Sequence, residues 1–283
     1  MHHPKDVEKF KRYCIDTKVI ESPSQPYVKI GTVCLESNAR YDNQSRLHLL
    51  YKIIEQSIEK LDLLLFPAGY FSTDHLPARS KLLWLEQKIK THLNKLDSDL
   101  VVCLGIDGNQ GRDQYAVTCS RKGIQSIGRK FHPAPNEYMD PAESFLSEEE
   151  GFNRIIEIKG KKFYTAVCYD SFGIKNHQIK NPGVDGILNL VHQFWPKGEG
   201  NSGDVFFARH GFAGAAKQWN CPIFGAAVFF NREVPVNWPT GVTWSLDDKL
   251  TTRYWKYENN TYTSYDEFKL IDKEKAIVKF YKL

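Results

Sequence analysis

The stretch LLLFPAGYF, residues 63–71, places four apolar residues directly before a proline. An unbroken apolar run is typical of a strand that is buried on both faces, and proline cannot continue the hydrogen-bonding ladder of an interior strand. The strand is therefore expected to end at Pro67, at the rim of a sheet, where binding sites are commonly built. The first residue beyond the proline is Ala68, whose methyl group can carry no chemistry.

Strands and helices alternate on both sides of this stretch. Residues 27–35 and 99–107 read as further apolar strands, while residues 45–61 and 80–96 carry apolar side chains at helical spacing. A strand–helix series with strands too apolar to face water predicts an α/β fold built on a buried, mixed sheet.

Beyond residue 110 the pattern changes to strands with few helices between them. The expected elements are strands at 113–123, 151–160, 161–170, 183–191 and 221–230, a helix around 206–219, and a strand-rich tail with a turn at Asn259–Asn260. Residues 1–26 are polar and rich in helix breakers, so they are expected to form an N-terminal extension. Residues 27–283 are expected to form a single domain.

Composition narrows the class of protein. The chain has 283 residues, of which 41% are hydrophobic and 25% charged, as in globular proteins. A net charge of +4 with scattered Lys and Arg does not favour nucleic-acid binding. The absence of an apolar run that could serve as a leader or a membrane span predicts a cytoplasmic protein. Six cysteines without a CxxC pair favour free thiols over zinc sites or disulfides.

Cys168 is the candidate nucleophile. It ends the apolar run of FYTAVCYDSFG, residues 163–173, and precedes a polar turn. A thiol at a sheet edge can act as a nucleophile when a nearby cation stabilises its thiolate, although a lone cysteine is more often a small buried hydrophobe. Lys130 in GRKFHPAPNE, residues 128–137, is the candidate cation, and a solvated surface lysine is the ordinary alternative. Glu137 closes that segment.

Three segments, in this order, resemble the carbon–nitrogen hydrolase superfamily, the nitrilase and aliphatic amidase group. They are Phe-Pro after a strand at residues 63–71, Arg-Lys-x-His-x-x-Pro-x-x-Glu with one residue fewer at 129–137, and apolar-Cys-Tyr-Asp at 166–173. The resemblance spans roughly residues 27 to 232 and implies a four-layer αββα sandwich with mixed sheets. It also implies a homodimer or higher homo-oligomer that hydrolyses small amides or nitriles without a metal or organic cofactor.

The resemblance implies a role for each matched residue. Cys168 would attack the amide or nitrile carbon, and Lys130 with the backbone N–H of Tyr169 would stabilise the oxyanion, which needs preorganised donors. Glu137 matches a supporting glutamate. Three residues near the nucleophile, Phe172, His192 and Trp195, are expected to line the substrate pocket.

One expected group is missing, because the resemblance implies a general-base glutamate at the position of Ala68. Loss of a positioned base typically costs on the order of 10²- to 10⁴-fold in rate. Three explanations are open: a natural pseudoenzyme that binds a ligand or partner, an engineered substitution that traps an intermediate, or another carboxylate in the role. Glu36, Glu137 and Asp170 are the candidates for the last.

Two further expectations follow from the missing glutamate. Without it, Lys130 should lie unpaired near Cys168, which would favour a readily alkylated thiolate alongside poor turnover. The rival enzyme class is a Cys/His hydrolase of papain-like logic, with His132, His192 or His210 as the base.

Overall fold

The computed structural model describes residues 27–37, 42–177, 179–199, 203–235, 238–243, 262–269 and 275–283. The predicted extension at 1–26 and the turn at Asn259–Asn260 lie outside the described residues. The strands are β1 Lys29–Ser37, β2 Leu63–Leu65, β3 Phe71–Ser72, β4 Val101–Gly108, β5 Asp113–Ser120, β6 Gly123–Arg129, β7 Ile155–Ile158, β8 Lys161–Val167, β9 Gly186–Phe194, β10 Ile223–Phe230, β11 Gly241–Val242, β12 Tyr262–Lys269 and β13 Lys275–Lys282. The helices and helical turns are α2 Asn43–Ser57, η1 Ala78–Lys81, α3 Leu82–Lys95, η2 Asn109–Gly111, α4 Asp170–Asn176, α5 Asp204–Phe206, the π-helical η3 Phe207–Phe212 and α6 Ala213–Trp219.

The strands form one hydrogen-bonded set in the order β6-β5-β4-β2-β1-β10-β9-β8-β7. Strand β1 joins its two halves, because Ile30–Thr32 pair with β2 and Cys34–Ser37 pair with β10, while the other edge of β1 pairs with β13. Along this path the strands β4, β2, β1, β10, β9 and β8 run parallel to one another, whereas β5 and β7 at the two ends of this run are antiparallel to them. Their carboxyl ends therefore point the same way, and residues from both halves can meet at that edge.

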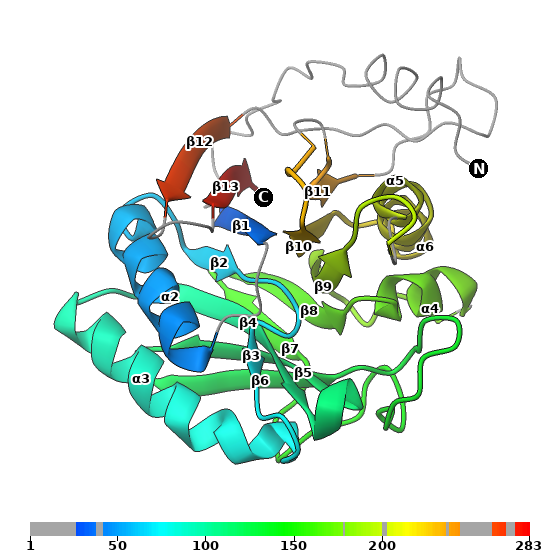
Figure 1. Cartoon of the computed structure of the whole chain (residues 1–283), viewed down its shortest axis with the longest axis horizontal. Helices are drawn as coiled ribbons and strands as arrows, with labels where there is room; N and C mark the ends of the chain where they lie inside the picture. The colour runs from blue at the N-terminus through cyan, green and yellow to red at the C-terminus, as the bar shows by residue number, and fades with distance from the viewer. Residues whose placement is uncertain are drawn as a thin grey trace.

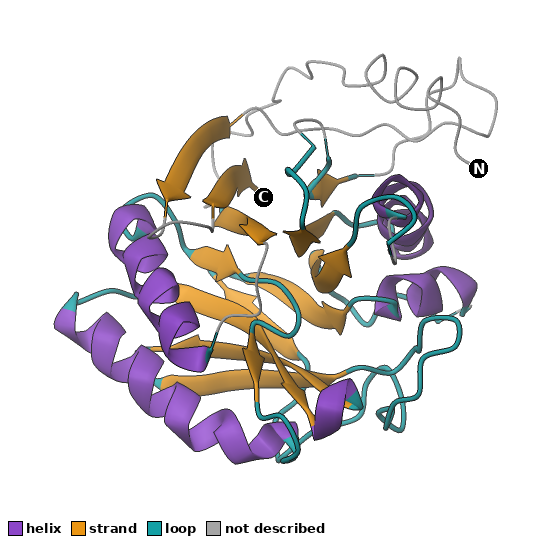
Figure 2. Cartoon of the chain, viewed as in Figure 1, coloured by secondary structure: helices purple, strands orange, loops and turns teal. Residues whose placement is uncertain are grey.

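The two halves lie face to face between two layers of helices. Strands β5 and β6 pack against β8, which brings the halves together. Helix α3 packs on β5 and β6 and lies beside α2 on one side, whereas α4 and α6 pack on β8 and β10 on the other (Figures 1 and 2). This is the αββα sandwich with mixed sheets that the resemblance implied.

The alternating side chains of β2 explain why its sequence is uniformly apolar. Leu64 belongs to the core beneath α2 and α3, whereas Leu63 and Leu65 belong to the core between the two halves. All three side chains are fully buried. Because both faces of the strand are covered, the usual alternation of apolar and polar residues is lost.

Most predicted elements are confirmed, but the short strand β3 and two longer elements were missed. The sequence reading gave no strand at β6 and no helix at α4, which begins directly after Cys168 and Tyr169. The five cysteines in the described part of the chain are free and buried. None of the described helices is long and apolar enough to cross a membrane.

Candidate active site

Cys168 occupies a tight turn between β8 and α4. Its φ of 48° lies in the left-handed region, which costs energy for a residue with a side chain and is frequent at functional sites. Its N–H donates to the Leu190 carbonyl at 2.6 Å. Its carbonyl accepts from Asn189 Nδ2 at 3.1 Å and from Ser171 Oγ at 3.2 Å. Neighbouring elements thus fix the backbone that carries the thiol.

Lys130 follows β6 and is 1% exposed. Its Nζ donates to both carboxylate oxygens of Glu137 at 2.6 Å, and Glu137 also accepts from Ala134 N–H and Gln114 Nε2. Burial alone would raise the pKa of Glu137, but the Lys130 charge and these hydrogen bonds hold it below its ordinary value. The expectation of an unpaired Lys130 is therefore wrong, because Glu137 supplies the carboxylate.

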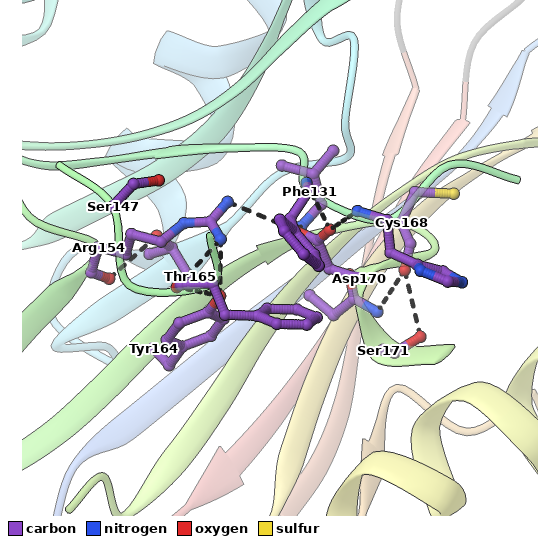
Figure 3. Close-up of polar contacts among 12 residues, drawn as sticks. Phe131, Ser147, Arg154, Tyr164, Thr165, Cys168, Asp170 and Ser171 are labelled. Atoms are coloured by element: carbon purple, nitrogen blue, oxygen red, sulfur yellow. Dashed lines mark hydrogen bonds and ion pairs between the residues drawn. The ribbon is translucent and has the colours of Figure 1, made fainter. Parts of the chain in front are cut away.

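Asp170 ties the nucleophile turn to the segment that follows β6 (Figure 3). Its Oδ1 accepts from the N–H groups of Phe131 and His132, each at 2.8 Å. Its Oδ2 accepts from Val167 N–H at 3.0 Å and lies 3.5 Å from Arg154 Nη2. The carboxylate is fully buried and committed to these partners. Its contacts therefore make it a structural acid and do not suit it to replace the glutamate that the resemblance implies at position 68.

His192 and Asp107 form a pair beside the thiol. Nε2 of His192 on β9 lies 3.2 Å from each carboxylate oxygen of Asp107 on β4. The N–H of Cys168 donates to the carbonyl of Leu190, two residues before His192 on β9, so the imidazole lies close enough to influence the pKa of the thiol. Burial by itself lowers the pKa of His192, but the charge and hydrogen bond of Asp107, with Cys168, raise it to about 10. Burial by itself raises the pKa of Cys168, but Lys130 and His192 more than offset this and lower it.

No family model and no curated protein matches this chain, whereas solved structures do match. A Cys-to-Ser variant of the Nesterenkonia sp. AN1 amidase, from the nitrilase superfamily, is 15% identical with a TM-score of 0.53, covering 73% of this chain and 78% of that one. This chain has the nitrilase-superfamily fold. A double variant of the same amidase in complex with acrylamide is 15% identical, with a TM-score of 0.53 and coverage of 74% and 79%. A Glu-to-Gln variant whose active-site cysteine carries a Michael adduct of acrylamide is 15% identical, with a TM-score of 0.52 and coverage of 71% and 78%.

Within this nitrilase fold, Ala68 begins the turn after β2 and Pro67. Its N–H donates to the Val191 carbonyl at 3.1 Å, which links the turn to the strand that carries His192. Glu36 accepts from Val234 N–H at 2.8 Å and lies 3.8 Å from Lys275 Nζ. The Glu36 carboxylate therefore links β1 to the segment after β10 and to Lys275 on β13.

The three predicted pocket residues have different surroundings. His192 pairs with Asp107 and helps to lower the pKa of the Cys168 thiol, as described. Phe172 is buried and stacks on Tyr169, with ring centroids 4.7 Å apart, and on Phe206 at 5.8 Å. Trp195 packs against Phe230, with centroids 4.3 Å apart. Phe172 thus lies next to the turn that carries Cys168, whereas the ring of Trp195 packs on a residue of β10.

Sequence reasoning missed Asp107. It lies in the glycine-rich stretch GIDGNQG, residues 105–111, which reads as a turn between strands. A usable signal was present, because Asp107 follows the apolar run of β4 and the carboxyl ends of parallel strands meet at one edge. Because β8 and β9 run parallel to β4 in the same sheet, residues near their carboxyl ends are expected at the same edge as Asp107.

The turn that carries Ala68 depends on close approach at Gly105. A Cβ at this position would lie 2.4 Å from Ala68 Cα and 2.5 Å from Gly69 N, which are backbone atoms with no room to move. We expect Gly105→Ala to lower the free energy of unfolding by about 1 to 3 kcal/mol. Urea denaturation measures this, and an unchanged midpoint would contradict the close packing of β4 on this turn.

Proposed function

We propose that this protein hydrolyses non-peptide carbon–nitrogen bonds in small amides or nitriles through an acyl thioester at Cys168. One observation carries the proposal: a thiol fixed on a turn with positive φ, beside a buried Lys130. Burial would raise the pKa of this thiol, yet Lys130 and His192 lower it, so a thiolate is available as the nucleophile.

The oxyanion formed by this attack needs donors that are already in position. Lys130 is one candidate, and its ion pair with Glu137 holds the ammonium group in a fixed place. The N–H of Tyr169 is the other candidate, and no acceptor takes it within the described part of the chain. In this proposal Phe172, His192 and Trp195 line the pocket, and no cofactor takes part. A cytoplasmic location and a homodimer or higher homo-oligomer belong to the same proposal.

Intact mass spectrometry tests the proposal. The protein is incubated with a panel of small amides and nitriles, and both the protein mass and product release are followed. We expect an acyl-sized mass increase that maps to Cys168 and disappears in Cys168→Ala. Cys221→Ala serves as the matched control, because the pKa of that buried thiol is raised to about 12 by burial, and it should keep the adduct.

The second candidate function, a pseudoenzyme that binds a ligand or partner, is favoured by Ala68 at the position of the general base. Ala68→Glu separates the two. If Ala68→Glu turns over substrate while the unaltered chain keeps its adduct, the protein is an enzyme that is slow because it lacks the general base. If neither chain gains an adduct or releases a product with any compound, the hydrolase function is overturned and the binding function remains.

A further inference from the structure

The Asp107–His192 pair joins the two halves of the sandwich, next to the turn that carries Cys168. Asp107 lies on β4 in one half, His192 on β9 in the other, and Cys168 at the end of β8. His192 Nε2 lies 3.2 Å from the Asp107 carboxylate, and the N–H of Cys168 donates at 2.6 Å to the carbonyl of Leu190, two residues before His192 on the same strand. About 23% of the His192 side chain is exposed, so water or a substrate can reach the ring.

This pair lies against the turn where the glutamate is missing. Gly69, next to Ala68, has a φ of +60°, and a Cβ there would lie 2.6 Å from Asp107 Oδ2 and 3.4 Å from His192 Cδ2. The hydrogen bond from Ala68 N–H to the Val191 carbonyl fixes the turn one residue before His192. An imidazole therefore stands beside both the nucleophile and the turn from which a base at position 68 would act.

We propose that His192, oriented by Asp107, is the proton-transfer residue of this site and takes the role that Ala68 cannot fill. The proposal rests on the proposed function for its reaction. Asp107 is a positioning residue: it binds Nε2, so in this proposal Nδ1 is the ring nitrogen that exchanges protons with the thiol and the leaving group. A carboxylate that fixes the tautomer and stabilises the imidazolium is how histidine serves cysteine and serine nucleophiles in other folds.

For an amide substrate, water is the only other reactant that these steps need. The thiol proton rests on His192, and the thiolate attacks the carbonyl carbon to form a tetrahedral oxyanion. As the C–N bond breaks, the imidazolium gives its proton to the leaving amine, and an acyl thioester remains beside neutral imidazole. Water then adds to the thioester while its proton passes to His192, and the C–S bond breaks to give the carboxylic acid and restore the thiolate–imidazolium pair.

The charged groups around the pair favour this ionised state. They are Asp107, which acts on His192, and Lys130, which acts on the thiolate. Burial opposes both charges, yet the pKa of Cys168 is lowered and that of His192 is raised to about 10. The ion pair should therefore persist from the lowered pKa of Cys168 up to about pH 10. Below that range the thiolate becomes protonated, and above it the imidazolium loses its proton.

The pH profile of Cys168 alkylation tests the pair without a substrate. Iodoacetamide rates, mapped by peptide, are compared for the unaltered chain, His192→Gln and Asp107→Asn, with His132→Gln as the matched control. The His132 ring is half-buried, and its backbone N–H keeps the bond to Asp170. We expect the rate at pH 7 to fall at least tenfold in His192→Gln, which is about one pKa unit, less in Asp107→Asn, and not in His132→Gln. An unchanged profile in His192→Gln would overturn the proposal.

A second measurement needs no variant of His192. Nitrogen-15 NMR of labelled histidines should show that the His192 ring of the unaltered chain carries a proton on both nitrogens at pH 7. In Cys168→Ser, which has no thiolate, the ring should lose one of these protons at a lower pH. A neutral ring at pH 7 in the unaltered chain would overturn the ion pair.

Failure of the proposed function looks different from failure of this inference. If no amide or nitrile modifies Cys168 while the alkylation profile depends on His192, the hydrolase fails and the ion pair stands. If acylation occurs, we expect His192→Gln to slow acylation or product release by roughly 10²- to 10⁴-fold. Acylation and turnover at unaltered rates in His192→Gln would overturn the proton-transfer role alone.

Discussion

Replacing Asp170 with alanine should lower the free energy of unfolding by about 3 to 5 kcal/mol, because it removes one partner of a buried ion pair. Arg154 is 1% exposed and Asp170 is fully buried, so the guanidinium would be left without its carboxylate in the interior. Three backbone N–H groups, of Phe131, His132 and Val167, would lose their acceptor in the same step. Each unsatisfied buried donor adds to the cost.

Urea denaturation of Asp170→Ala measures this loss, with an unchanged slope showing that the same surface is exposed on unfolding. Asp140→Ala is the matched control, because Asp140 lies 2.8 Å from Arg112 while both side chains are more than a third exposed. Exposed pairs contribute about 0 to 1 kcal/mol, so the control should be nearly neutral. Equal losses in the two variants would contradict a structural role for the Asp170 network.

The core layers of the fold could be predicted because the information lies in local patterns. Uniformly apolar β2 and the helical spacing of α2 and α3 each reflect which faces are covered. The edge strand β6, with the sequence GIQSIGR, carries no such pattern, because glycines and polar residues interrupt it. Helix α4 has seven residues, too few to be stable alone, and it forms because α6 and η3 pack against it.

The site divides in the same way between local and distant contacts. Cys168, Lys130 and Glu137 could be named because each stands in a short segment with characteristic neighbours. The pairing of Asp107 with His192 joins residues 85 positions apart, and it depends on how β4 and β9 face each other across the sandwich. One sequence indicates that the ends of parallel strands gather at one edge, but it does not show which side chains pair there. For the same reason it named His192 as a pocket residue and as the base of a rival class, without the carboxylate of Asp107 that pairs with it.

Replacing Lys130 with methionine should slow the acylation of Cys168 by roughly 10²- to 10³-fold, the usual effect of removing one oxyanion donor. Methionine fills a similar volume in this nearly fully buried position, so packing is largely kept. The loss combines two effects of one charge, since Lys130 is both a candidate oxyanion donor and the leading group that lowers the pKa of Cys168 against burial. Rapid-quench mass spectrometry of the acyl adduct measures the rate, with a substrate identified from the amide and nitrile panel.

The unpaired Glu137 left by this substitution must be separated from the missing cation. Lys130→Met combined with Glu137→Gln removes both charges, and Gln keeps an oxygen that can accept from Ala134 N–H. We expect the double variant to regain stability relative to Lys130→Met, because no carboxylate is then buried without its partner. Acylation should stay slow in the double variant, because neither substituted side chain offers a positive charge to the oxyanion. Recovery of acylation together with stability would mean that Lys130 only neutralises Glu137, and the oxyanion would then depend on Tyr169 N–H and on His192.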